Sequence, residues 1–252
     1  MCLSGLMLTL AASASPAAIP TITITTGTGP AGGYLPLSSF GVAPIAGVGD
    51  DTLTDFTTPA FMFAGESWTH LRVSSNGYLV VGPGNGAADN NPFNTSLPAL
   101  GFPTNVLAPF WTDLDPSVGG GVRIALLSNA IDSWIVTDWE GVPQYGSVNT
   151  DSFQVWLQTG ATEGITFSYG WLDSVANGHL TIGADDSTGT VGATYYFDGT
   201  GTLPASGSEL RVTSEGLPAS PVPLPAAASA GMALLAGLGA VRFLRRRHPR
   251  AT

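Results

Sequence analysis

The sequence predicts an all-β protein whose main domain is an antiparallel β-sandwich, and three observations predict it. Between Thr21 and Leu217 no helical periodicity of apolar residues occurs; short strand-like runs recur instead, each bounded by Gly, Asn, Asp or Pro. The segment Phe153–Gln158 alternates in the manner of a strand with two different faces. Glycine (33) and proline (19) supply many turns among the 252 residues, while a hydrophobic content of 44% excludes intrinsic disorder.

The expected strands follow one another at the short spacing that is typical of a sandwich. They are Trp68–Ser74, Tyr78–Val81, Val122–Leu127, Ser133–Trp139, Phe153–Gln158, Ile165–Tyr169, Leu180–Ala184, Thr194–Phe197 and Leu210–Thr213. The first two flank Ser75-Asn76-Gly77, which is typical of a hairpin turn. In the fifth, Trp156 lies on the face opposite Phe153, so it is either covered by a second layer or exposed.

The two ends differ in composition from the middle, and we expect six segments. These are a signal peptide (1–20), a Thr/Gly/Pro-rich segment (21–54), the β-sandwich (55–213), a Pro-rich linker (214–225), a single transmembrane helix (226–244) and a basic cytoplasmic tail (245–252).

The N-terminus has most features of a secretory leader. Leu6–Ala12 is apolar, and Ala12-Ser13-Ala14 offers a small-x-small cleavage pattern, although the basic residues that usually precede the apolar run are missing. A buried N-terminal helix is the alternative. Pro16 and Pro20 argue against it, because proline ends a helix. We therefore expect export.

The C-terminus combines three features in a fixed order. Residues 218–222 form a Pro/Ser linker, Ala226–Val241 is an apolar run of 16 residues, and arginines follow it. The run is at the short limit for crossing a bilayer. Positive charge stays on the cytoplasmic side, so the arginines would stop translocation there. The stop-transfer residues are Arg245, Arg246 and Arg247.

Together these features resemble the PEP-CTERM sorting signal in its VPLPA variant. The motif residues are Val222, Pro223, Leu224, Pro225 and Ala226, without the Glu of the commoner Pro-Glu-Pro form. The resemblance implies a Gram-negative bacterium and an exosortase, a membrane protease that processes the tail. It also implies a precursor held transiently in the inner membrane, a product at the cell surface or outside the cell, and association with exopolysaccharide or biofilm matrix.

The middle of the chain, from Asp55 to about Val212, resembles the nidogen-like (NIDO) extracellular domain. The matching segments occur in family order: Val73–Gly82 with its Asn-Gly turn, Leu107–Asp115 with Ala-Pro-Phe-Trp, and Asn149–Leu157 with Phe-Gln-Val. The resemblance implies extracellular adhesion or matrix association rather than catalysis.

Charge and residue usage exclude several classes of function. All eight basic residues are arginine, so chemistry that needs a lysine amine is excluded. Five arginines lie in the tail, which leaves Arg72, Arg123 and Arg211 against all 18 carboxylates, a net charge of −15. Such a surface repels phosphate backbones, so nucleic acid is not an expected partner. The single cysteine, Cys2, lies in the leader, so the mature chain has no disulfide.

Asp113 and Asp115 are the strongest candidate for a polar site. Two residues apart in an extended segment, they face the same side and could bind Ca²⁺ together with carbonyl oxygens of Gly119–Gly121. The alternative, which we favour, is that both cap a tight turn before Pro116. We expect no other cofactor.

A carbohydrate-binding or glycoside-active domain is the alternative function. Asp138 and Glu140 share a strand face beside Trp139, and two carboxylates are what glycoside hydrolysis requires. Trp139, Trp156 and Tyr145 could form an aromatic surface for sugars, although core packing is the simpler interpretation. We expect the protein not to be an enzyme.

Overall fold

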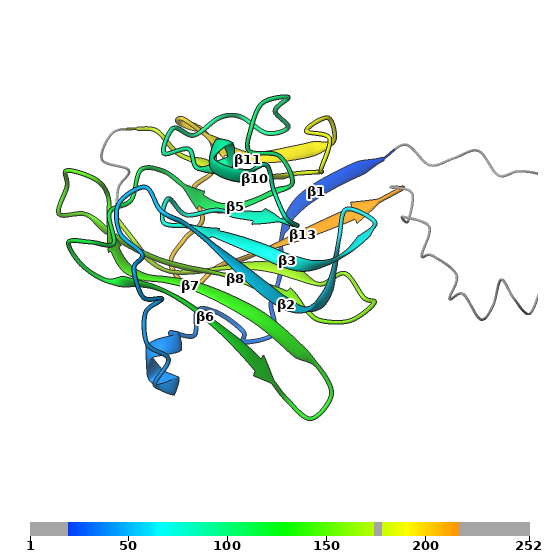
Figure 1. The fold of residues 1–252 in the computed structure, drawn as a ribbon, viewed down its shortest axis with the longest axis horizontal. Helices are drawn as coiled ribbons and strands as arrows, with labels where there is room; N and C mark the ends of the chain where they lie inside the picture. The colour runs from blue at the N-terminus through cyan, green and yellow to red at the C-terminus, as the bar shows by residue number, and fades with distance from the viewer. Residues whose placement is uncertain (1–19, 174–177, 217–252) are drawn as a thin grey trace, which may run out of the picture. The chain divides into compact units, whose positions relative to one another are not determined.

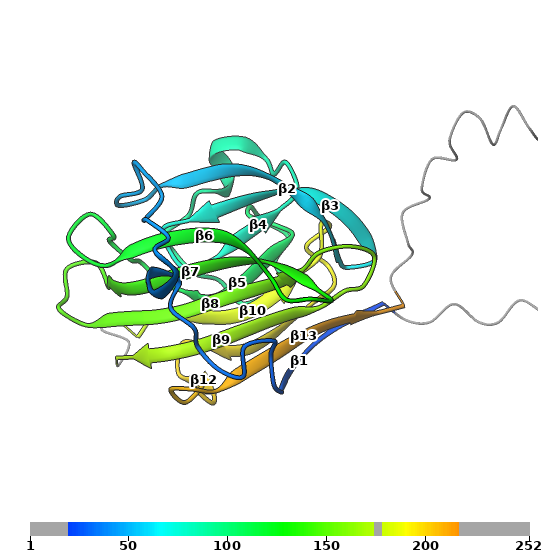
Figure 2. The same ribbon diagram turned by 90° about the horizontal axis from the view of Figure 1, so that it is seen from below.

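A computed structural model of the protein describes residues 20–173 and 178–216. These residues form two antiparallel sheets packed face to face, seen as two layers in Figures 1 and 2. The first sheet has six strands, in the order β1 (Thr21–Thr26), β13 (Glu209–Glu215), β9 (Ile165–Leu172), β8 (Thr150–Gln158), β7 (Ser133–Pro143) and β6 (Gly121–Ser128). The second has seven, in the order β12 (Thr200–Gly201), β11 (Gly192–Phe197), β10 (Thr181–Asp185), β5 (Val106–Trp111), β4 (Leu79–Val81), β3 (Glu66–Ser74) and β2 (Leu53–Phe63). The predicted all-β sandwich is confirmed.

The main core lies between the two sheets. In β8, every second side chain from Phe153 onwards is apolar and points into this core. Phe153, Val155 and Leu157 are buried against the opposite sheet. The ring of Phe153 stacks on Trp139 of β7 with centroids 5.1 Å apart, and it lies 5.2 Å from Phe110 of β5. The indole N–H of Trp139 donates to the carbonyl oxygen of Ser74 across the sandwich. The packing of these large side chains sets the register of the layers.

The outer face of the six-stranded sheet is covered by the segment that follows β1. This segment contains the short 3₁₀-helix η1 (Leu37–Phe40), which lies beside β6 in Figure 1. Leu37 is buried in a small cluster with Val136 and Trp156. Trp156 is therefore covered by a second layer, one of the two outcomes that its place on the strand allowed.

The outer face of the seven-stranded sheet is covered by the long loop between β4 and β5. The loop carries the 3₁₀-helix η2 (Gly86–Asp89), and Leu97 from this loop packs on Tyr78 and Trp111. The hydroxyl of Tyr78 donates to the carbonyl oxygen of Asp89, and the indole of Trp111 donates to that of Asn91. Each of the two sheets thus has a core on both faces.

Most predicted strands and the hairpin at Ser75–Gly77 are confirmed. Gly77 has a φ of 77°, and a Cβ there would collide with the carbonyl oxygen of Phe110, so the turn requires glycine. The sandwich, however, begins before residue 55. β1, with its alternating Thr and Ile residues, belongs to the sandwich because it pairs with β13, the last strand of the domain. β2 begins at Leu53.

The leader, the sorting motif Val222–Ala226, the expected transmembrane helix 226–244 and Arg245–Arg247 lie outside the described residues. Within the described residues, no helix has the length and apolar character needed to cross a membrane.

Candidate functional site

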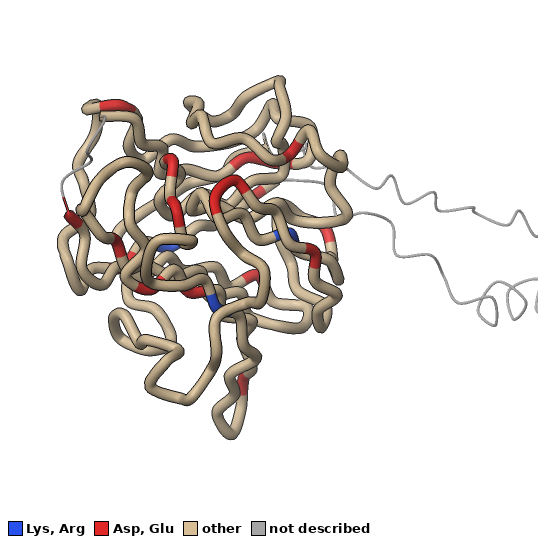
Figure 3. Tube along the Cα trace, turned by 60° about the vertical axis from the view of Figure 1, so that its left-hand side comes forward, with Lys and Arg blue, Asp and Glu red and all other residues tan. Residues whose placement is uncertain are grey.

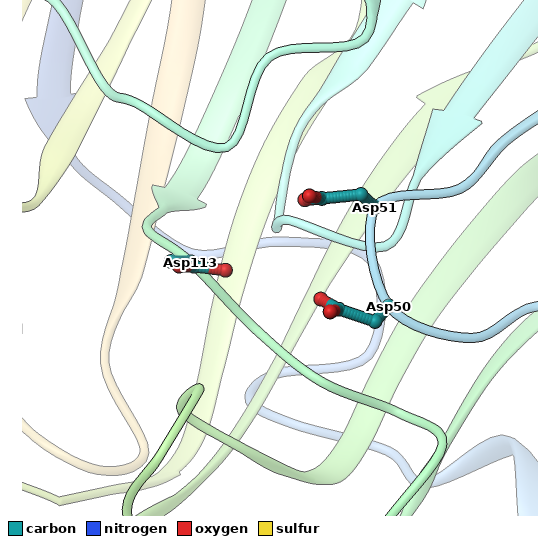
Figure 4. Close-up of side chains that lie close together, drawn as sticks. All are labelled: Asp50, Asp51 and Asp113. Carbon is teal, nitrogen blue, oxygen red and sulfur yellow. The ribbon is translucent and has the colours of Figure 1, made fainter.

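Three carboxylates converge at one end of the sandwich. Asp50 and Asp51 immediately precede β2, whereas Asp113 follows β5, and their carboxylate oxygens all lie within 4.8 Å of one another. Figure 4 shows the three side chains pointing toward a common point. The group lies among connections between strands, where sandwich proteins commonly place binding residues. We call residues 49–52, 112–118 and 144–149 together the acidic loop end.

Hydrogen bonds of the main chain and of the Asn76 side chain join these three connections. The Tyr145 N–H donates to the carbonyl oxygen of Asp113 at 2.9 Å, and the Asp115 N–H donates to that of Pro143 at 2.9 Å. Asn76, in the β3–β4 turn, donates from its side chain to the Asp51 carboxylate and accepts from the Leu114 N–H, both at 2.8 Å. The fold therefore holds the three carboxylates close together despite the repulsion between their like charges.

Asp113 differs electrostatically from an ordinary surface aspartate. Partial burial, together with the like charges of Asp51, Asp50 and Asp115, raises the pKa of its carboxyl from 3.8 to about 6. The pKa of Asp50 is raised as well, by burial and by the like charges of Asp51 and Asp115. Among the described residues, no side chain or N–H group donates a hydrogen bond to the Asp113 carboxylate. This carboxylate is free to accept hydrogen bonds or to attract a cation.

Asp115, the other predicted metal ligand, has a different arrangement. It is buried, and one of its oxygens accepts hydrogen bonds from the Ser117 N–H at 2.9 Å and from the Ser117 hydroxyl. These bonds close the turn after β5. The structure thus places Asp113 with Asp50 and Asp51, whereas Asp115 caps the turn. Asp50 and Asp51 were not among the predicted site residues, although the sequence shows them as an Asp-Asp pair directly after Gly49.

The converging carboxylates suit a hard cation. Ca²⁺ binds six to eight oxygen ligands, mainly carboxylates, carbonyls and water. Asp50, Asp51 and Asp113 could supply three or more of them, with water completing the shell.

A cavity of about 680 Å³ adjoins Asp113. It is lined by Pro92, Phe93, Asn94, Thr112, Asp113, His179 and Asp198. The Asp198 carboxylate accepts hydrogen bonds from Asn94 at 2.8 Å and from the Leu180 N–H at 3.0 Å, and it lies 3.5 Å from the exposed ring of His179. The cavity combines polar groups with one aromatic side chain, Phe93.

Asp138 and Glu140, the candidate pair for glycoside hydrolysis, hold the N-terminal segment on the sheet. Asp138 is fully buried and accepts hydrogen bonds from the Tyr34 hydroxyl at 3.0 Å and from the Leu37 N–H at 2.8 Å. Glu140 accepts from Ser38 and forms an ion pair with Arg123 at 3.2 Å. Both acids fasten the covering segment to the sheet.

The aromatic surface that we considered from the sequence does not exist as a unit. Trp139 lies in the main core and Trp156 in the outer core, and both are almost wholly buried, because each face of β7 and β8 is covered. Only Tyr145 is exposed, at 51%, and it lies beside Asp113. Sugar binding through Trp139 and Trp156 is therefore excluded.

The charge of the described chain is strongly acidic (Figure 3). Of its three arginines, Arg72 pairs with Asp55 and Asp89, and Arg123 pairs with Glu140. Within the part of the chain that the structure describes, Arg211 forms no ion pair. The negative field at the acidic loop end thus has little compensation from basic side chains.

Searches of curated proteins and of solved structures returned no match to this chain. A family model described as NIDO related matches residues 26–219, which include β2 to β13 and therefore nearly all of both sheets. The chain belongs to the NIDO-related family.

Proposed function

We propose that the protein is an exported, non-catalytic adhesive domain that acts at the cell surface or in an extracellular matrix. The observation that carries the proposal is the NIDO-related match over residues 26–219, because this family suggests an extracellular domain with an adhesive role. The strongly acidic surface favours partners other than nucleic acid, namely exopolysaccharide or other matrix components.

The proposed route to the surface depends on the C-terminal tail. Val222–Ala226 is the proposed sorting motif, the following apolar run would hold the precursor in the inner membrane, and Arg245–Arg247 would retain its end in the cytoplasm. An exosortase-type protease would then cut near the motif. Each proline in Val222–Pro225 disfavours helix in the preceding residue, and an extended segment, which we expect here from the sequence, would suit a protease cleft.

The proposal of a non-catalytic role is supported by how the carboxylates are used. Asp138 and Glu140, the pair that we considered for glycoside hydrolysis from the sequence, hold the segment around Leu37 in place. Neither carboxylate is left available to activate a water or to protonate a leaving group.

Localisation and intact mass test the proposal. In the native host, the protein should be found at the surface or in the medium, and mass spectrometry should show that residues 226–252 are missing from it. Replacing Arg245, Arg246 and Arg247 by Ser should lower the yield of this processed form and leave the circular dichroism of the β domain unchanged. Extracellular protein that still ends at Thr252 would contradict the sorting route, and protein found only in the cytoplasm would contradict the function.

A further inference from the structure

We propose that the cavity beside Asp113 binds an uncharged sugar residue of a polysaccharide, with Phe93 as the surface on which the sugar ring stacks. The inference rests on the proposed adhesive function and names a ligand class and a site for it.

The size and aromatic wall of the cavity fit a sugar. Its volume of about 680 Å³ is within the range of small-ligand sites. Phe93 is 76% exposed, so its ring is accessible to a ligand in the cavity that it lines. The C–H face of a pyranose ring is apolar and would cover this ring.

Phe93 is held in place before any ligand binds. Its N–H donates to the side-chain oxygen of Asn91 at 3.0 Å. The Asn91 N–H donates to the hydroxyl of Tyr78 at 2.8 Å, and the Asn91 carbonyl accepts from the indole of Trp111 at 3.0 Å. Tyr78 and Trp111 are fully buried and pack with ring centroids 4.6 Å apart. The main chain that carries the exposed ring is therefore fixed to the buried outer core, which lowers the entropic cost of ordering this loop on binding.

The polar wall offers mainly hydrogen-bond acceptors. The Asp113 carboxylate accepts no hydrogen bond from the described residues. The amide nitrogen of Asn94 donates to Thr181 and Asp198, which fixes the orientation of this side chain. The exposed imidazole of His179 adds a donor. Sugar hydroxyls, which can all donate, complement such a set.

The charge of this region selects against acidic sugars. Asp113 and Asp198 line the cavity, and Asp50 and Asp51 adjoin it. A uronate carboxylate would be repelled by these groups, whereas a neutral sugar would not. We therefore expect a neutral or N-acetylated residue and not a uronic acid.

Isothermal titration calorimetry with the purified full chain tests the inference. The probes are cellohexaose, maltohexaose, N-acetylchitohexaose and hexagalacturonate, with EDTA present so that no metal contributes. At least one neutral probe should bind saturably, and hexagalacturonate should not. Phe93→Ala and Asp113→Asn should each weaken binding by about tenfold or more. The matched controls Phe40→Ala and Glu215→Gln, at exposed positions away from the cavity, should leave affinity unchanged.

Three results would overturn the inference: no binding of any neutral probe, binding that Phe93→Ala leaves intact, or equal binding of hexagalacturonate. Circular dichroism of each variant separates lost binding from lost folding. The result is independent of the sorting experiment. A correctly processed surface protein that binds no neutral probe would contradict the cavity proposal alone, and a protein that binds sugar but stays in the cytoplasm would contradict the proposed function alone.

Discussion

The two outer faces of the sandwich and its acidic loop end use carboxylates in opposite ways. On the outer faces, Asp138 fastens the N-terminal segment, and Asp185 holds the β4–β5 loop through the N–H groups of Val106 and Ala99. At the loop end, Asp113 accepts no hydrogen bond from the described residues and faces two other acids. The first group is satisfied by main-chain donors, and the second is not.

This difference indicates which acids maintain the fold and which are available to a ligand. A buried carboxylate that accepts main-chain hydrogen bonds stabilises the loop that donates them, and its removal leaves buried donors unpaired. A partly exposed carboxylate among like charges destabilises the fold slightly and is free for binding. Four experiments test this distinction, and they are given in descending order of expected effect.

The largest effect is expected in the outer core of the seven-stranded sheet. Trp111→Ala should lower the free energy of unfolding by about 3–5 kcal/mol, because it removes a fully buried aromatic side chain and leaves a cavity. Chemical denaturation measures the loss. Trp171→Ala is the matched control, since Trp171 is 63% exposed, and it should cost less than about 1 kcal/mol. A loss below that value for Trp111 would contradict its role in the core.

The next effect is expected for the acid that fastens the N-terminal segment. Asp138→Ala should cost about 2–3 kcal/mol, because the Leu37 N–H and the Tyr34 hydroxyl lose their acceptor. Asp138→Asn retains one acceptor oxygen and should cost less. Asp113→Ala is the comparison and should not destabilise the protein. Equal losses at both positions, measured by denaturation, would abolish the distinction between the two groups.

The pH dependence of stability tests the buried acids together. Burial raises the pKa of Asp138 and Asp151 to about 6 and that of Asp185 to about 7, from 3.8. The folded state then binds protons more tightly than the unfolded state, so stability is greatest near pH 4 and falls as the pH rises to about 7. We expect the melting temperature to be roughly 5 °C higher at pH 5 than at pH 8. Asp185→Asn should flatten this dependence, and a melting temperature that rises with pH over this range would contradict it.

The smallest effect is expected from Ca²⁺ at the acidic loop end. At pH 7.5, millimolar Ca²⁺ should raise the melting temperature by roughly 1–2 °C, because it neutralises the carboxylates of Asp50, Asp51 and Asp113. Asp113→Asn should remove this rise, whereas Asp115→Asn should retain it, provided that the Ser117 turn stays closed. Identical melting curves in Ca²⁺ and in EDTA would mean that the loop end holds no calcium.

The fold class and most of the strands could be predicted from the amino-acid sequence alone. Alternation in Phe153–Gln158 assigns Phe153, Val155 and Leu157 to one buried face, because successive side chains of a strand point to opposite sides. The Asn76-Gly77 pair determined the hairpin between β3 and β4, because such a turn requires a positive φ that glycine adopts readily. These features depend on neighbours in the chain.

What covers each face of the sheets and which acids meet depend on contacts between segments that are distant in the sequence. By alternation, Trp156 lies on the same face of β8 as the polar residues Gln154 and Gln158. It is nevertheless buried, because Leu37, which is far away in the sequence, packs on it. β1 is a strand of the sandwich because it pairs with β13 at the other end of the domain. Asp113 meets Asp50 and Asp51 although β3 and β4 separate β2 from β5 in the sheet, because Asn76 in the β3–β4 turn bonds both to Asp51 and to the residue after Asp113. Contacts between distant segments leave no local periodicity in the sequence, so composition and spacing predicted the sandwich but not its candidate site.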